Sequence, residues 1–238
     1  MSSEASGVLY LLPNTLGDTA AEAVIPAAAL HRARSLDCFI AEDPKSARAF
    51  LKRIGYPRAL QNTRIERLDH NTPPADVASL LEPVLAGRDA GLLSEAGLPA
   101  VADPGAALVR LAHQKGVRVV PLSGPSSLFL ALAASGLEGQ RFAFHGYLPV
   151  PKSELVATLK ELERQSRRLD QTQIFIETPY RNESTLETML QTLGNDTLLC
   201  VAADLTLESE MVKTQSAAAW RKAVPQLKGR PTVFLLQS

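Results

Sequence analysis

The first half of the chain alternates short apolar runs with segments of helical periodicity. The apolar runs are residues 8–12, 36–41, 90–94 and 117–122, and the helical patterns lie around 19–34, 45–54, 74–86 and 104–115. Strands that alternate with helices form βα units, and successive βα units build a largely parallel sheet. We therefore expect an N-terminal α/β domain with a mostly parallel sheet.

The second half is richer in strands. A helical pattern from 125 to about 135 precedes strand-like runs at 141–148, 172–178, 197–205 and 232–236, with further helical patterns near 151–168 and 180–193. Because fewer helices separate these strands, we expect a mixed sheet. The turn-rich segment SGLEGQR at 135–141 indicates a boundary between 122 and 140. The prediction is two α/β domains, residues 1–122 and 123–238.

Composition narrows the class of protein. The 25 basic and 25 acidic side chains cancel, so no overall field favours nucleic acid or an anionic membrane. No run of about eighteen apolar residues and no leader-like N-terminus is present, so we expect a soluble, cytoplasmic protein without a membrane partner. Cys38 and Cys200 lie in apolar runs and are expected as buried free thiols. The four histidines are far apart in the sequence, which predicts no metal site.

Two loops rich in Gly and Pro each lead from a strand into a helix. They are GLLSEAGLPAVADPG at 91–105 and the segment around LSGPSSL at 122–128. Small molecules bind where strands end and helices begin in open α/β sheets, because backbone amides are unpaired there. Each loop alone is better explained as an ordinary strand-to-helix turn, but together they predict a ligand cleft. Ser94, Ser126 and Ser127 would supply short hydrogen-bonding side chains.

Several common motifs are absent from the sequence. It has no GxGxxG after a first strand, no GxxxxGK[ST] and no GxSxG. These absences argue against a Rossmann-type dinucleotide site, a P-loop nucleotidase and a serine hydrolase of the α/β type.

Six short motifs nevertheless follow one another in a familiar order. They are LPNTLGD (12–18), FIAEDPK (39–45), GLLSEAGLPAVADPG (91–105), LSGPSSL (122–128), IFIETPYRN (174–182) and VAADLT (201–206). The chain resembles the tetrapyrrole-methylase superfamily of S-adenosylmethionine-dependent methyltransferases. Within it the chain is most similar to the ribosomal RNA small subunit methyltransferase I family, which methylates a cytidine ribose 2′-hydroxyl. The likeness covers nearly the whole chain.

The resemblance implies a two-domain α/β homodimer that binds S-adenosylmethionine in a cleft between its domains. It also implies RNA or the ribosomal subunit as a partner. Carried over position by position, and with Ser94 included, the cofactor-binding residues would be Pro13, Ser94, Gly97, Leu98, Val101, Ser126 and Ser127, with Thr178 and Ala203 from the second domain.

Three departures from the family pattern concern the floor of the cleft, at PNT, and the phosphate contacts of the acceptor, at Lys45 and Leu207. PNT replaces PIGN, Lys45 stands where the family has arginine, and Leu207 stands where it has lysine. Lysine is a point charge that cannot form the bidentate contacts of arginine. We interpret the chain as a divergent paralogue. Three functions stay open at this point: ribose methylation of RNA, methylation of a small molecule such as a tetrapyrrole, and a non-catalytic S-adenosylmethionine-binding module.

Acidic residues at strand ends are the candidates for catalysis. Glu177, Glu42 and Asp43 each follow an apolar run, and a positioned base typically accelerates attack by a ribose hydroxyl 10² to 10⁴-fold. Arg181 would hold a phosphate or carboxylate of the acceptor. Structural alternatives are a helix N-cap for Asp43, which precedes Pro44, and an ion pair of Glu177 with Arg181, four residues on.

Two further patterns have a structural and a functional interpretation. Four cations recur at helical spacing on one face, namely Lys45, Arg48, Lys52 and Arg53. They are more simply explained as a solvated helix face, and the alternative interpretation is that they favour a polyanionic acceptor. Trp220 and the apolar residues Phe129, Leu130 and Leu132 are predicted to lie in the core.

Overall fold

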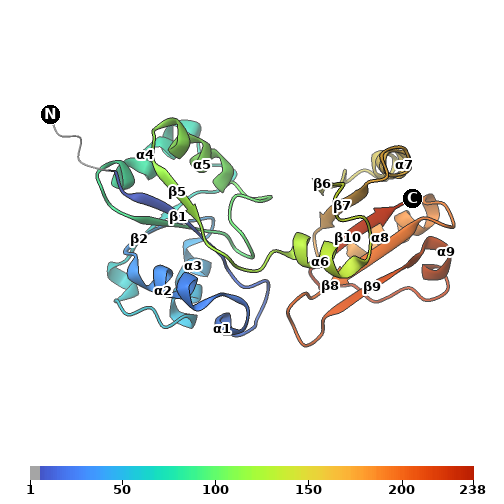
Figure 1. The fold of residues 1–238 in the computed structure, drawn as a ribbon, viewed down its shortest axis with the longest axis horizontal. Helices are drawn as coiled ribbons and strands as arrows, with labels where there is room; N and C mark the ends of the chain where they lie inside the picture. The colour runs from blue at the N-terminus through green and yellow to red at the C-terminus, as the bar shows by residue number, and fades with distance from the viewer. Residues whose placement is uncertain (1–5) are drawn as a thin grey trace. The chain divides into compact units, whose positions relative to one another are not determined.

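The computed structural model describes residues 6–238, which divide into two compact units (Figure 1). Unit 1 ends at Ser126 and unit 2 begins at Ser127. This division lies four residues after the predicted one, because the segment that follows strand β5 still packs against unit 1. A Cβ atom on Gly124 would lie 2.1 Å from Cβ of Pro13, so the two backbones are in close contact.

Unit 1 contains a five-stranded sheet in the order β3-β2-β4-β1-β5, and every pair is parallel. The strands are β1 (Val8–Leu12), β2 (Cys38–Ala41), β3 (Arg64–Arg67), β4 (Ala90–Leu93) and β5 (Arg118–Pro121). The helices are α1 (Ala21–Val24), α2 (Ala27–Ser35), α3 (Pro44–Arg53), α4 (Pro74–Leu85) and α5 (Gly105–Gln114), with a short 3₁₀ turn η1 (Leu60–Asn62). The predicted parallel α/β sheet is confirmed.

Helices cover both faces of this sheet, and each face has its own core. Figure 1 shows α4 and α5 on one side and α1 to α3 on the other. Phe39 and Phe50 belong to the core under α1 to α3, and Ile40 and Leu108 to the core under α4 and α5. A sheet buried on both faces explains why β2 and β4 are apolar throughout.

The single helix expected around residues 19–34 is two helices. Ile25 is extended (φ −114°, ψ 125°) and Pro26 precedes α2, because a residue before proline is pushed out of the helical region. The edge strand β3 was not predicted. Its sequence RIER is mostly charged, as edge strands often are.

Unit 2 contains a second five-stranded sheet in the order β6-β7-β10-β8-β9. β6 pairs with β7 in parallel and the remaining pairs are antiparallel, so the predicted mixed sheet is confirmed. The strands are β6 (Phe142–Tyr147), β7 (Thr172–Glu177), β8 (Leu198–Ala203), β9 (Met211–Ser216) and β10 (Thr232–Gln237). The helices are α6 (Ser127–Ser135), α7 (Lys152–Leu169), α8 (Asn182–Thr192) and α9 (Ala217–Trp220).

The core of unit 2 lies between the sheet and helices α7 to α9. Trp220 is buried there, as predicted, and its indole N–H donates to the Leu199 carbonyl at 2.8 Å. The prediction for α6 was partly wrong: Leu132 is buried, but Phe129 is 59% exposed and Leu130 38% exposed. α6 is apolar on all sides and can pack only one of them on the sheet, so Phe129 contacts Phe142 edge-to-face at the surface.

None of the helices formed by residues 6–238 combines the length and the apolar character that a membrane crossing requires.

Candidate functional site

The loops that follow β1, β4 and β5 leave the same edge of the unit 1 sheet. The register of the parallel strands brings their last residues to this edge, because Leu12 pairs with Leu93 and Leu11 pairs with Pro121. Asn14 joins two of the loops: its backbone N–H donates to the Gly97 carbonyl at 2.8 Å, and its side-chain amide donates to the carbonyls of Ser94 and Glu95. The predicted residues Pro13, Ser94 and Gly97 therefore lie close together.

The loops 94–101 and 123–126 also contact each other. Gly97 has φ +68°, and a Cβ atom there would lie 3.2 Å from Leu16 and 3.5 Å from the Pro125 carbonyl oxygen. Only glycine accepts this backbone angle without strain. The two Gly- and Pro-rich loops thus form one continuous surface in unit 1, with Ser126 at its end and Ser127 beginning α6.

Residues 98–105 form a loop with strained backbone at this surface. Leu98 is half-buried in this loop, and Val101 is 46% exposed. Ala100 (φ +66°) and Ala102 (φ +54°) adopt left-handed backbone, a strain of about 1 to 2 kcal/mol per residue that such loops retain at functional sites. Asp103 holds the loop in shape by accepting from the amides of Ala100 and Gly105.

Carboxyl groups gather at the neighbouring strand ends of unit 1. Glu42, after β2, is part-buried and lies 3.7 Å from Nε2 of His70. Burial raises the pKa of the Glu42 carboxyl, and the nearby charges of Glu95 and Asp103 raise it further. Burial likewise raises the pKa of Asp103. Sequence reasoning did not find His70, which stands 28 positions after Glu42.

The Asp43 side chain hydrogen-bonds to the first turn of helix α3. Its carboxylate accepts hydrogen bonds from the amides of Lys45 and Ser46 and from the Ser46 hydroxyl, at 2.8 to 3.1 Å. The hydrogen bond from the Ser46 hydroxyl lowers the pKa of Asp43 most, and the bonds from the two amides lower it further. Asp43 is thus the N-cap of α3, and the capping interpretation of this residue fits the geometry better than a role as base.

The strand ends of unit 2 bring a second group of predicted residues together. In the register of the sheet, Thr232 pairs with both Glu177 and Ala203. The Glu177 side chain is 3% exposed and lies 3.0 Å from Nη2 of Arg181, whose side chain is 20% exposed. Glu177 also accepts from Thr178 N–H at 2.7 Å and from the Thr185 hydroxyl at 3.2 Å. Its oxygens are fully engaged, so it positions Arg181.

A second buried ion pair flanks this edge. Asp204, 7% exposed in its side chain, accepts from Nε of Arg230 at 2.6 Å and from the Ser209 hydroxyl at 2.9 Å. The Asn182 amide donates to the Arg230 carbonyl, and its Oδ1 atom is buried without a partner in the described structure. Sequence reasoning found the VAADLT motif but missed Arg230, because the two ion-pair partners are 26 residues apart.

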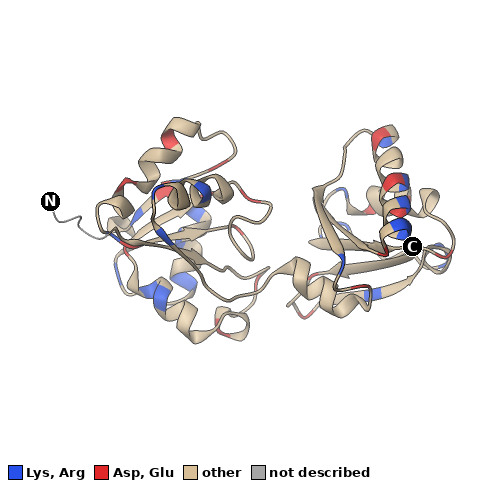
Figure 2. Ribbon diagram, turned by 45° about the horizontal axis from the view of Figure 1, so that its top comes forward, with Lys and Arg blue, Asp and Glu red and all other residues tan. Residues whose placement is uncertain are grey.

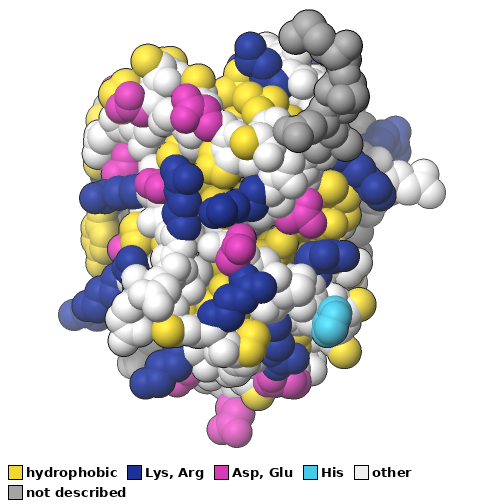
Figure 3. Space-filling model, turned by 90° about the vertical axis from the view of Figure 1, so that its left-hand side faces the viewer, with side chains coloured by type: hydrophobic (Ala, Val, Ile, Leu, Met, Phe, Trp, Pro, Cys, Tyr) yellow, Lys and Arg dark blue, Asp and Glu magenta, His cyan; other side chains and the backbone are white. Residues whose placement is uncertain are grey.

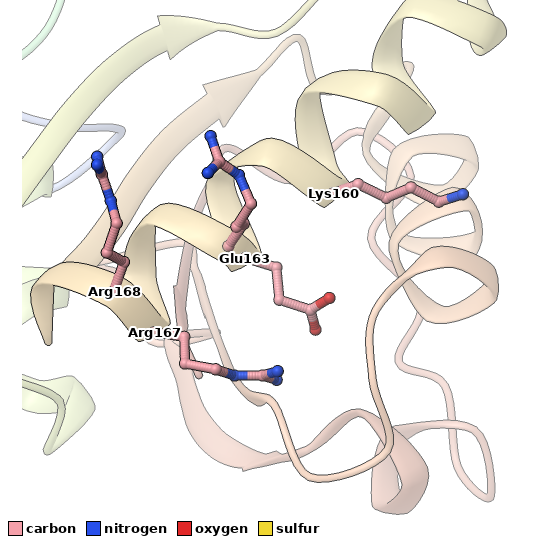
Figure 4. A pocket seen from close by; sticks show the side chains of 5 residues that line it. Lys160, Glu163, Arg167 and Arg168 are labelled. Atoms are coloured by element: carbon pink, nitrogen blue, oxygen red, sulfur yellow. The ribbon is translucent and has the colours of Figure 1, made fainter.

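Two hollows in the structure have basic side chains in their lining. One, of about 230 Å³, lies between α3 and the loop 14–17 of unit 1 and is taken up below. The other, of about 300 Å³, lies along α7 (Figure 4). In Figure 4, Lys160, Glu163 and Arg167 extend toward the same side, and Arg168 extends away. No cluster of His, Cys, Asp or Glu within residues 6–238 has an arrangement suited to a metal ion.

The α7 hollow is accounted for by local structure. Glu161 accepts two hydrogen bonds from Arg164, at 2.8 and 2.7 Å, and Arg167 donates to the Ser238 hydroxyl. Figure 2 shows both signs of charge along α7, the helix beside the C-terminus. Arg167 and Arg168 also occupy the last turn, where cations stabilise a helix. This surface is therefore a suitable control for charge effects elsewhere.

Comparison with known proteins agrees with the motifs. The family model of the Tetrapyrrole (Corrin/Porphyrin) Methylases matches residues 20–219. Ribosomal RNA small subunit methyltransferase I of Escherichia coli O157:H7 is 32% identical over 211 residues, which cover 89% of this chain and 70% of that protein. The protein of the same name from Mesorhizobium japonicum is 34% identical over 211 residues, covering 89% of this chain and 68% of that protein.

A solved structure shares the fold. The crystal structure of the methyltransferase CobJ superimposes with a TM-score of 0.64 and covers 98% of this chain and 95% of its own, at 19% sequence identity. The matched family model spans most of the chain, and the relatives exceed 30% identity over two thirds of their length or more. The resemblance seen in the six motifs is thereby confirmed, and the chain belongs to the tetrapyrrole methylase family of S-adenosylmethionine-dependent methyltransferases.

Proposed function

We propose that this chain transfers a methyl group from S-adenosylmethionine to a ribose 2′-hydroxyl in RNA of the small ribosomal subunit. The observation that carries the proposal is the identity of 32 to 34% with relatives named ribosomal RNA small subunit methyltransferase I, over almost nine tenths of this chain. Such a substrate places the protein in the cytoplasm. Its family also supports a homodimer, which light scattering of the purified protein tests directly.

The main-chain surface of unit 1 fits the methyl donor. The close-packed residues Pro13, Gly97 and Gly124 leave backbone rather than bulky side chains at the strand ends. Ser94 and Ser126 add short polar side chains to this surface, and the contacts expected of Ser127, Thr178 and Ala203 stay predictions. When bound, S-adenosylmethionine supplies an electrophilic methyl carbon, and the protein's contribution is to align the acceptor and exclude water.

On the acceptor side, Arg181 is the proposed anchor for a phosphate. Its guanidinium is held by buried Glu177 and reaches the surface only in part, so its geometry is fixed before substrate binds. Of the three carboxylates considered as bases, Glu42 has the fewest hydrogen-bond and ion-pair partners. Its raised pKa also makes it a stronger base than an ordinary glutamate, so Glu42 is the proposed proton acceptor.

The test is transfer of labelled methyl groups to small ribosomal subunits from cells that lack this chain. After digestion to nucleosides, mass spectrometry should find one 2′-O-methylated nucleoside. Glu42→Gln should lower kcat by at least 100-fold. The control variant Glu82→Gln, which removes an exposed carboxylate on α4, should leave kcat unchanged.

Three outcomes would overturn parts of the proposal. A methylated base in place of a ribose would refute the acceptor atom. Label in a tetrapyrrole but not in RNA would refute the substrate. Binding of S-adenosylhomocysteine without transfer to any fraction would identify a binding module.

A further inference from the structure

Helix α3 presents an uncompensated basic face. Its buried side, Ala47, Phe50 and Leu51, packs on the core of unit 1, and the opposite side carries Lys45, Arg48, Lys52 and Arg53, all exposed. Within residues 6–238, none of these four cations has an ion pair, and the side-chain ammonium groups of Lys45 and Lys52 have no hydrogen-bond partner. Figure 2 shows blue on the helices along the lower edge of unit 1, to which α3 belongs.

Other basic side chains among the described residues of unit 1 form ion pairs that the cations of α3 lack. The formal charges of the chain cancel, and Figure 3 shows basic and acidic side chains interspersed over one end of unit 1. Several arginines elsewhere in this unit are paired with carboxylates, such as Arg34 with Glu22 and Arg64 with Glu66. Asp43, the acid nearest to the four cations in sequence, is occupied as the N-cap of α3.

A hollow of about 230 Å³ adjoins the basic face. Its walls are the loop 14–17, the α3 residues Ser46, Ala49, Phe50 and Arg53, and Glu95 with Ala96. Nη1 of Arg53 donates to the Thr15 hydroxyl at 3.0 Å, and Thr15 is 4% exposed. Arg53 is thus oriented by a buried partner that leaves its charge unneutralised.

The position of the hollow relates it to the methyl-donor surface. Glu95 and Ala96 lie in the same loop as Gly97, Leu98 and Val101, so a chain bound in the hollow runs beside the proposed donor contacts. From Lys45 to Arg53 the helix rises about 12 Å, which is enough for about two or three phosphates of a nucleic acid strand. Arg53 offers hydrogen-bond donors to a phosphate, and the Glu95 carboxylate accepts from ribose hydroxyls or base amino groups.

We propose that the basic face of α3 and the hollow beside it bind the sugar–phosphate backbone of the RNA next to the acceptor nucleotide. This inference rests on the proposed function for its substrate. It assigns the contact to backbone phosphates, which carry no sequence information, so the contact supplies affinity and register.

The test compares two sets of charge-neutralising substitutions. The first is Lys45→Gln, Arg48→Gln and Lys52→Gln on α3. The matched control is Lys160→Gln, Arg167→Gln and Arg168→Gln on α7, which changes the net charge equally. A third variant, Arg53→Lys, keeps the charge and removes the two-pronged donor. Binding of a fluorescent 20-nucleotide single-stranded RNA is measured from 0.05 to 0.4 M salt, and S-adenosylhomocysteine binding by calorimetry checks that each variant is folded.

The α3 variant should flatten the plot of log affinity against log salt by about 2, since each single-strand phosphate contact contributes about 0.7. At 0.15 M salt this corresponds to a loss of roughly 50-fold in RNA affinity. The α7 variant should change the affinity by less than about 3-fold, and Arg53→Lys should raise KM for RNA without changing S-adenosylhomocysteine affinity.

The inference is overturned if the α3 variant binds RNA like the unsubstituted protein, if the α7 variant loses as much affinity, or if the unsubstituted protein does not bind RNA. Its failure is distinguishable from that of the proposed function. RNA binding that depends on α3 without methyl transfer would refute the function alone. Methyl transfer that the α3 substitutions leave unchanged would refute this inference alone.

Discussion

The buried pair of Glu177 and Arg181 allows a sharp prediction about stability. Glu177→Gln leaves an acceptor for the Thr178 amide but places an uncharged group 3.0 Å from a guanidinium that is only one-fifth exposed. Breaking a buried pair costs about 3 to 5 kcal/mol. Because Arg181 retains some contact with water, we expect a loss of about 3 kcal/mol in the free energy of unfolding of unit 2.

A double-mutant cycle separates the pair from its surroundings. Arg181→Gln alone should also cost about 3 kcal/mol, because it leaves the Glu177 charge buried. The double substitution should cost little more than either single one, which gives a coupling of at least about 2 kcal/mol. Urea unfolding followed by fluorescence reports on unit 2, since the chain has one tryptophan, buried Trp220.

Two results would refute this reasoning. Single losses below about 0.5 kcal/mol that simply add would show that the pair behaves like one on the surface. If Glu177→Gln abolished methyl transfer while leaving stability and substrate KM unchanged, Glu177 would be the base, and Arg181 would not depend on it for its position.

Further predictions concern unit 1 and the thiols. Ala102→Gly should raise the free energy of unfolding by about 1 kcal/mol, because it relieves a φ of +54°. The control Ala78→Gly, inside α4, should lower it by about the same amount. Thermal melts in which both substitutions change stability in the same direction would contradict this. Burial raises the pKa of Asp103 in the folded state, so its contribution to stability is present at low pH and lost as the pH rises above about 4, its unfolded value. Relative to Asp103→Asn, the unsubstituted protein should therefore be less stable at pH 7 than at pH 4 by circular dichroism, and a pH-independent difference would refute the assignment. Burial also raises the pKa of Cys38 and Cys200, so neither thiol should react with Ellman's reagent at pH 8 until denaturant is added, and rapid labelling of the native protein would count against their burial.

Apolar patterning was sufficient for most of the fold. Strands such as β2 and β4 are buried on both faces, so they appear as continuous apolar runs. The edge strands β3 and β9 escaped prediction, because only one side of an edge strand pairs with the sheet and their sequences, RIER and MVKTQS, are largely polar. Phe129 shows the converse case, in which an apolar residue of α6 lies at the surface.

Contacts within the site were predictable only where the two residues that form them are close in sequence. The spacing of Glu177 and Arg181 pointed to their ion pair, and Asp43 before Pro44 pointed to a cap. The pairs formed by Glu42 with His70 and by Asp204 with Arg230 depend on the fold to join distant segments, and local patterns carry no information about them.

The central claim is that main-chain atoms of unit 1 hold the methyl donor. Hydrogen exchange measured by mass spectrometry, with and without saturating S-adenosylhomocysteine, tests it directly. At a ligand concentration of 100 times Kd, exchange should slow by up to about 100-fold in peptides covering residues 94–105 and 121–127, and peptides from α7 should be unaffected. Binding that leaves both loops unprotected, or no binding at millimolar ligand, would contradict the account.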